Sequence, residues 1–201
     1  MPAGSTVTMT INLGDIAKKS SVRACVDKIV KQRVLEAHGD MLQAFNDHDV
    51  TKEIEGGPTA PRKVLSRGNL FAFIGFRSGT QPTELLRNLL RRRPLVRRGR
   101  VGKVKKNSIN FLYFVTPFKE KEIFSATPLP WERGKSWVRG IEKGISGFGA
   151  FIFTTSRRLK NSRSGTGLQV KSRRIGGDRS FKGGIDYLGA IRKEFERSLT
   201  N

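Results

Sequence analysis

The distribution of charge constrains this chain more than any other feature of its sequence. The 201 residues hold 39 Lys and Arg against 17 Asp and Glu, which gives a formal net charge of +22. Residues 1–60 carry seven basic and eight acidic residues, whereas residues 61–201 carry 32 and nine. A compact domain with so much charge of one sign repels itself. We therefore expect an anionic partner, or an assembly in which neighbouring copies share the field.

Two acid-free blocks hold most of the positive charge. Ten basic residues lie between Arg87 and Lys106, and seven more lie between Ser156 and Arg174. Such blocks stay solvated unless an anion orders them, and closely spaced cations release counterions from a polyanion. Solvated loops without a partner and a phosphate-contacting surface both remain open as interpretations. The predicted contacts to nucleic acid or to a neighbouring subunit are Arg91, Arg92, Arg93, Arg97, Arg98, Arg100, Arg157, Arg158, Lys160 and Arg163.

The residue types that support catalysis or metal binding are scarce. The single cysteine, Cys25, excludes a disulfide framework, and we expect it to be a small buried side chain. The only histidines, His38 and His48, are expected to be solvated or to cap a helix. Gly134-Lys135-Ser136 lacks the glycine that a phosphate-binding loop needs five positions earlier, where Leu129 stands. The sequence predicts no enzymatic activity, no metal and no cofactor.

The hydrophobic pattern predicts an α+β fold in which a small mixed or antiparallel sheet packs against two helices. The first helix runs from Ser20 to about Asn46, and the last covers about Phe181–Leu199. Ser108–Thr116 alternates as a central strand, and Thr6–Leu13 is a candidate edge strand within an N-terminal arm over residues 1–19. Residues 20–201 are expected to form a single domain with long basic loops at 91–107 and 156–166.

Shorter segments complete this expectation. A polar loop is predicted over Thr51–Gly68, and a buried strand is predicted over Asn69–Phe76. The phenylalanines of the apolar strands, Phe114 among them, are expected in the core rather than stacked on bases. The remaining predicted elements are a helix opened by Thr80 and Pro82 with Leu85, Leu86, Leu89 and Leu90 on one side, a return strand at Lys119–Ser125, a rigid turn at Pro128–Trp131, a helix near Gly134–Ile145, and paired strands at Ala150–Thr155 and Gly167–Ser172.

The order of several motifs resembles the small neck or tail-completion proteins of tailed bacteriophages. These motifs are Asn69–Phe76 with Pro82 after it, Leu129-Pro130-Trp131, a helix leading to a strand, the Ser162–Gly165 hairpin tip and the terminal amphipathic helix. The resemblance covers about residues 60–200. It implies a structural virion protein, assembled in the host cytoplasm, that forms a ring between portal and tail proteins and has no enzymatic activity.

A ring of such subunits would line a DNA channel, where contacts to phosphates suit transit better than sequence-specific contacts. The alternative is a ribosomal-type or other non-specific nucleic-acid-binding protein, for which a high positive charge is ordinary. No apolar run is long enough to cross a bilayer, so no membrane partner is expected.

Overall fold

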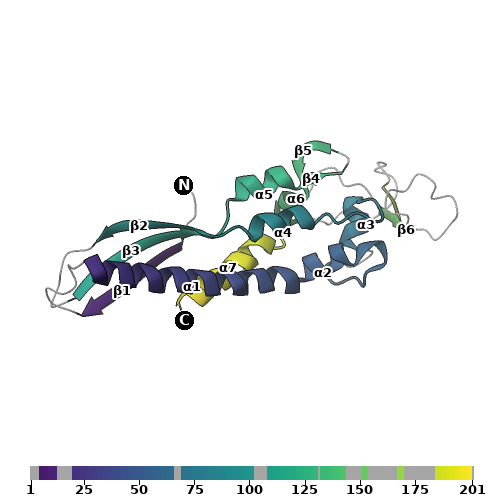
Figure 1. Ribbon diagram of the computed structural model, residues 1–201. Helices are drawn as coiled ribbons and strands as arrows, with labels where there is room; N and C mark the ends of the chain where they lie inside the picture. The colour runs from purple at the N-terminus through teal and green to yellow at the C-terminus, as the bar shows by residue number, and fades with distance from the viewer. Residues whose placement is uncertain are drawn as a thin grey trace. The chain divides into compact units, whose positions relative to one another are not determined.

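The computed structural model has the α+β architecture that the sequence predicts (Figure 1). It describes residues 5–12, 20–65, 69–101, 108–130, 132–143, 151–153, 167–169 and 184–200. Two compact units divide the chain: the first comprises Met1–Ala44, Leu90–Lys119 and Ile191–Asn201, and the second comprises Phe45–Leu89 and Glu120–Ala190. Three of the four boundaries fall inside helices, and the fourth lies between Lys119 and Glu120. The single domain predicted over residues 20–201 stays a prediction.

The first unit is built around a three-stranded antiparallel sheet in the order β1-β3-β2. Its strands are β1 (Ser5–Asn12), β3 (Ser108–Thr116) and β2 (Leu95–Val101). The predicted central strand and the predicted N-terminal edge strand are thus confirmed. The predicted basic loop at 91–107 is wrong for residues 95–101, because these residues form strand β2, which pairs with β3. Residues 102–107 lie outside the described residues, and so does the second predicted basic loop at 156–166.

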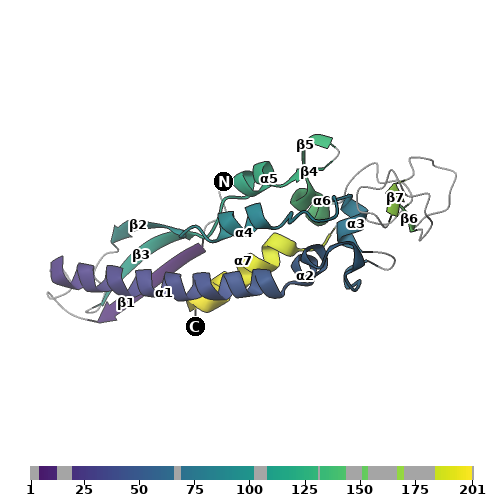
Figure 2. The same ribbon diagram turned by 45° about the vertical axis from the view of Figure 1, so that its right-hand side comes forward.

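Helix α1 (Ser20–Asp47) supplies the long apolar stripe of the first unit. Val26, Val30, Val34 and Met41 are buried at four- and seven-residue steps, as the period of a helix requires. Ile109, Phe111, Tyr113 and Val115 alternate along β3 and are likewise buried. Both views show α1 running along one face of the sheet (Figures 1 and 2). Helix α7 (Tyr187–Thr200) begins later than predicted, and its predicted stripe at Leu188, Ile191, Phe195 and Leu199 is buried.

The second unit consists of short elements. The helices are α2 (Asp49–Glu55), the 3-10 helix η2 (Gly57–Thr59), α3 (Leu70–Ile74), α4 (Glu84–Leu90), α5 (Glu120–Ala126) and α6 (Trp137–Lys143). Two antiparallel pairs accompany them: β4 (Pro128–Leu129) with β5 (Glu132–Ser136), and β6 (Phe151–Phe153) with β7 (Gly167–Gln169). The helix predicted near Gly134–Ile145 and the two strands predicted around residues 150 and 170 are confirmed in this form.

Three predictions for this unit are wrong. The segment predicted as a loop, Thr51–Gly68, contains most of α2 and all of η2. The predicted strand Asn69–Phe76 is helix α3, and the predicted return strand Lys119–Ser125 is mostly helix α5. The pattern of a five-residue apolar run fits a buried strand and a buried helix equally well. The residues at the two ends of the run therefore determine which of the two forms.

The ends of α3 explain its helical state. The Asn69 side chain accepts a hydrogen bond from the Ala72 amide at 2.9 Å and donates to the carbonyl of Pro58 at 2.8 Å. Gly75 has a φ of 81°, a left-handed conformation that glycine adopts without strain, and its N–H donates to carbonyls of the last turn. An asparagine cap and a glycine terminator therefore close a single buried turn of helix.

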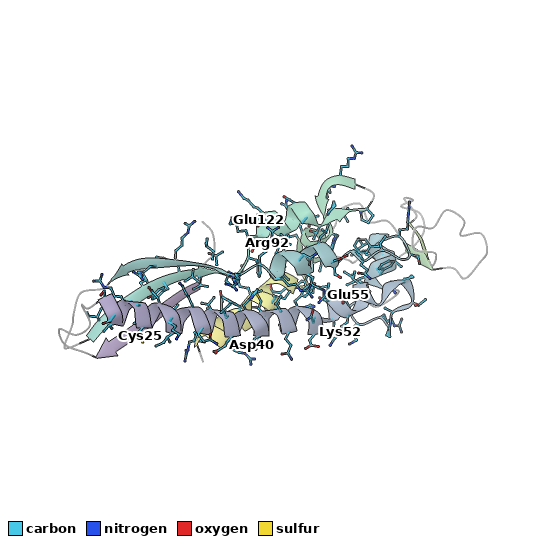
Figure 3. All side chains as sticks on the ribbon, viewed as in Figure 1. Cys25, Asp40, Lys52, Glu55, Arg92 and Glu122 are labelled. Carbon is cyan, nitrogen blue, oxygen red and sulfur yellow. The ribbon has the colours of Figure 1, made fainter. Side chains whose placement is uncertain are left out.

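Three side chains differ from their predicted surroundings. Cys25, labelled in Figure 3, is exposed rather than buried. His38 is buried rather than solvated, and its Nε2 donates to the carbonyl of Leu90 at 2.7 Å, since a carbonyl only accepts. Leu85 is 59% exposed, although Leu86 and Leu90 of the same helix are buried. A cysteine or a leucine placed one position away from a helical stripe faces solvent, and the sequence pattern did not separate these neighbours.

His48 caps α2, as predicted for a histidine in this region. Its Nδ1 accepts a hydrogen bond from the Val50 amide at 3.2 Å, and its ring meets Tyr187 edge-on. Burial lowers the pKa of His48 below its usual 6.5, against the smaller opposing effect of Asp49 and Asp186. The folded state therefore favours the neutral ring, which is also the only form whose Nδ1 accepts the cap.

We expect the stability of the protein to fall more steeply below pH 6.5 than it would without this histidine. A lowered pKa in the folded state means that the unfolded chain takes up the proton first, so this stability is present above pH 6.5 and is lost as the pH falls. His48→Asn keeps a capping oxygen and removes the titration. Urea unfolding at pH 5 and pH 7.5 should give a smaller pH difference for the variant, and equal differences would contradict the assignment.

Candidate polyanion-contact surface

The three arginines Arg91–Arg93 lie in an exposed turn between α4 and β2. Two buried residues bracket this turn, Leu90 before it and Pro94 after it. Both flanking residues are apolar and buried, and the segment between them runs along the surface, where all three arginines are exposed. Arg92 is labelled in Figure 3.

Strand β2 sends its two described arginine side chains to opposite faces of the sheet. Arg97 is paired in register with Phe114, and Arg98 is paired with Tyr113. Successive residues of a strand alternate between faces, and paired residues share one. Arg97 therefore shares the outer face with Phe114, which is 46% exposed, whereas Arg98 shares the inner face with the buried Tyr113.

Arg98 is bound within its own unit. Its guanidinium forms an ion pair with Asp27 of α1, and its Nε lies 3.2 Å from Asp27 Oδ1. The hydroxyl of Tyr113 donates to the same oxygen at 2.6 Å. Asp27 thus joins α1 to two strands of the sheet. A paired guanidinium is a weaker candidate for a phosphate contact than an unengaged one, because the phosphate must compete with the carboxylate.

The neighbouring arginines offer a matched pair of variants. Arg97→Gln is expected to weaken binding to duplex DNA by several-fold while leaving the unfolding midpoint in urea nearly unchanged. Arg98→Gln is expected to lower the free energy of unfolding by about 1 kcal/mol, since half-exposed ion pairs contribute little more than that. Equal effects of the two substitutions on stability would contradict the assignment of Arg98 to the inner face.

The outer face of the sheet carries no acidic residue. None of the three strands contains Asp or Glu. The described side chains of this face include Thr8 and Thr10 of β1, and the Thr10 hydroxyl donates to Asn110 at 2.8 Å. The first unit as a whole holds 19 Lys and Arg against six Asp and Glu. An anion that approaches this face meets hydroxyls, an aromatic ring and Arg97, and no carboxylate of the three strands repels it.

Phe114 is the residue of this face that sequence reasoning missed. It was predicted in the core with the other phenylalanines of the apolar strands, and it is exposed. Its ring and the Leu112 side chain lie over Gly99, where an added Cβ would come within 3.0 Å of the ring. The alternation of β3 could have predicted this exposure. Tyr113 and Val115, on either side of Phe114, are both buried, so Phe114 lies on the opposite face of the strand.

The described residues bring together only part of the predicted contact set. Arg91, Arg92, Arg93 and Arg97 are each exposed in the first unit, and Arg98 is bound to Asp27. Arg100 lies on β2, where only its backbone is described. The remaining predicted residues, Arg157, Arg158, Lys160 and Arg163, lie outside the described residues.

In the described part of the chain, no three His, Cys, Asp or Glu side chains are grouped as metal ligands would be. No described helix has both the length and the apolar character needed to cross a membrane. Comparison of the chain with protein-family models, curated proteins and solved structures gave no match in any of the three.

Proposed function

We propose that this chain is a structural virion protein of a tailed bacteriophage, a ring-forming neck or tail-completion adaptor between portal and tail. The observation that carries the proposal is the acid-free outer face of the sheet with Arg97 on it, preceded in the chain by the exposed turn Arg91–Arg93. We call the outer face of the sheet together with Arg97 and the turn Arg91–Arg93 the basic face. In this proposal the basic face is directed toward the DNA channel or toward the next subunit of the ring. The order of the sequence motifs supplies the family.

The chemistry of the basic face suits contact with phosphates rather than with base edges. Base readout requires a helix or ribbon that enters a groove with several aligned donors and acceptors. A turn of three arginines with a fourth on a neighbouring strand supplies charge without such a pattern. Contacts of this kind let a duplex slide, which a channel for DNA requires.

A second candidate function rests on Phe114. An exposed aromatic ring on a sheet, next to an arginine, is typical of platforms on which bases of single-stranded nucleic acid stack. This feature favours the alternative of a ribosomal-type or other RNA-binding protein, which acts as a single copy. The absence of enzymatic activity stays a prediction under both candidates.

The oligomeric state separates the two candidates. We expect the purified chain, alone or with its portal, to form discrete rings in negative-stain micrographs and a single high-mass species in mass photometry. A protein that remains monomeric at micromolar concentration with the portal present, and that binds a folded RNA more tightly than duplex DNA at the same ionic strength, would replace the first candidate with the second.

A further inference from the structure

The second unit contains a hollow of about 590 Å³ whose lining comes from α5, the β4–β5 hairpin and α6. Its apolar lining includes Phe124 and Leu129. Three cationic residues also line it: Lys135 from β5, and Arg139 and Lys143 from α6. A volume of this size lies within the range of about 300–1,000 Å³ that is usual for ligand pockets.

The local fold explains why these cations gather there. Trp137, Val138 and Ile141 of α6 are buried, so the opposite side of the helix is turned outward. Arg139 and Lys143 are four residues apart and share that outward side. Gly140 lies between them and lines the hollow without a side chain to fill it.

Two hydrogen bonds close the base of the β4–β5 hairpin, where α6 begins. The Trp137 amide donates to the carbonyl of Thr127 at 2.8 Å, and the hydroxyls of Thr127 and Ser136 are 2.7 Å apart. Both threonine and serine are buried. The walls of the hollow are therefore held by paired polar groups, while Arg139 and Lys143 are exposed at its lining.

None of the described lining residues of the hollow is acidic. The one acid of α6, Glu142, is directed elsewhere: its Oε1 accepts a hydrogen bond from the Leu188 amide at 2.8 Å. Among the described residues, no carboxylate lies within ion-pairing distance of Arg139 or Lys143. The hollow thus combines apolar surface with two cations, Arg139 and Lys143, that no described carboxylate pairs.

We propose that this hollow binds an acidic peptide segment with one bulky apolar side chain, supplied by a neighbouring protein of the particle. The apolar side chain packs on Phe124 and Leu129, and the flanking carboxylates pair with Arg139, Lys143 and Lys135. Duplex DNA matches this site less well, because its phosphates lie on a stiff, convex backbone and offer no apolar group to a recess. The source of the peptide, a neighbouring protein of the particle, rests on the proposed function. The chemistry of the peptide is argued from the lining of the hollow alone.

The test measures binding of a fluorescein-labelled peptide in which one phenylalanine is flanked on both sides by aspartates, by fluorescence anisotropy on the full chain at physiological salt. We expect saturable binding to the wild type. Replacing the phenylalanine of the probe by serine, or its aspartates by lysines, is expected to weaken binding by about tenfold or more, since each charge-assisted contact contributes roughly that factor.

Two variants and one matched control locate the site. Arg139→Glu reverses a cation of the hollow, and Ser125→Trp fills the hollow from an exposed lining position. Arg133→Glu makes the same charge reversal at an exposed position of β5 outside the lining. We expect the first two variants to weaken peptide binding by about tenfold or more and the third to weaken it less than threefold.

Three outcomes would overturn the proposal. The first is unchanged peptide affinity in both Arg139→Glu and Ser125→Trp, with circular dichroism spectra like that of the wild type. The second is an equal loss in Arg133→Glu, which would indicate attraction by net charge alone. The third is a wild type that binds duplex DNA through Arg139 and does not bind the peptide. Ring formation is scored separately in micrographs, so its failure counts against the proposed function only.

Discussion

Replacing Arg91, Arg92, Arg93 and Arg97 together by glutamine is expected to lower the affinity for duplex DNA by about a hundredfold or more at about 0.1 M salt. Each phosphate contact by a cation contributes about 0.9 to the slope of log affinity against log salt concentration. Losing four contacts therefore reduces the magnitude of the slope by about 3.6. We expect the difference between wild type and variant to shrink as salt is raised, because the lost free energy comes from counterion release.

The control for this experiment removes the same charge from another place. Lys52, Arg77, Lys121 and Arg133 are exposed cations of the second unit, and their replacement by glutamine leaves the same net charge of +18. If the basic face makes the contacts, this control should change the slope by less than one. Equal losses in the two quadruple variants, measured by filter binding or anisotropy at four salt concentrations, would show that binding follows net charge and would contradict the basic face.

The elements that the sequence predicted well are those with many periods. Helix α1 repeats its apolar stripe from Val26 to Phe45, and β3 alternates from Ile109 to Val115. Each additional turn or pair of residues adds independent evidence for the same period. Helix α7 was predicted for the same reason; its end was placed within one residue, and its start, predicted at about Phe181, lies at Tyr187.

The elements that were missed are short helices whose ends are set by individual side chains. Helix α3 is a single turn whose cap, Asn69, also bonds the carbonyl of Pro58. Helix α2 begins at a histidine cap, which a propensity scale does not favour. The apolar pattern of five to seven residues does not reveal a contact such as that between Asn69 and Pro58, nor a histidine cap. The sequence alone therefore predicted a strand and a loop for these segments.

The same limit applies to the candidate surface. Acid-free blocks located Arg91–Arg93 and Arg97, because local composition is readable in a sequence. The difference between Arg97 and Arg98 was not readable, because it depends on Asp27, which is 71 residues from Arg98. Sequence reasoning found the charge of the surface, and the pairing in the fold distinguished a cation that faces outward from one that holds α1 against the sheet.

The side chain of Glu53 fixes the backbone of segments that lie 10 to 17 residues later in the sequence. It lies on α2, is 1% exposed, and accepts three backbone hydrogen bonds. Oε1 accepts from the Leu70 amide at 2.6 Å, and Oε2 accepts from the amides of Lys63 and Val64 at 3.0 and 2.9 Å. One carboxylate therefore fixes both the segment after η2 and the start of α3, where the sequence predicted a loop and a strand.

Glu53→Ala is expected to lower the free energy of unfolding by about 3–5 kcal/mol, because three amide groups lose their acceptor and each unsatisfied buried group costs about 1–3 kcal/mol before relaxation. Such a loss is a large share of the 5–15 kcal/mol typical of a domain. Glu53→Gln keeps one acceptor oxygen and should cost about half as much. The exposed Glu84, on α4, is the matched control, and Glu84→Ala should change stability by less than about 1 kcal/mol.

Urea unfolding followed by the fluorescence of the buried Trp137 gives the three free energies, and hydrogen exchange of the Lys63, Val64 and Leu70 amides reports on the bonds themselves. We expect these three amides to exchange faster in Glu53→Gln even where the rest of the second unit stays protected. A Glu53→Ala protein as stable as Glu84→Ala, with the three amides still protected, would mean that other groups hold this segment and that the carboxylate does not organise it.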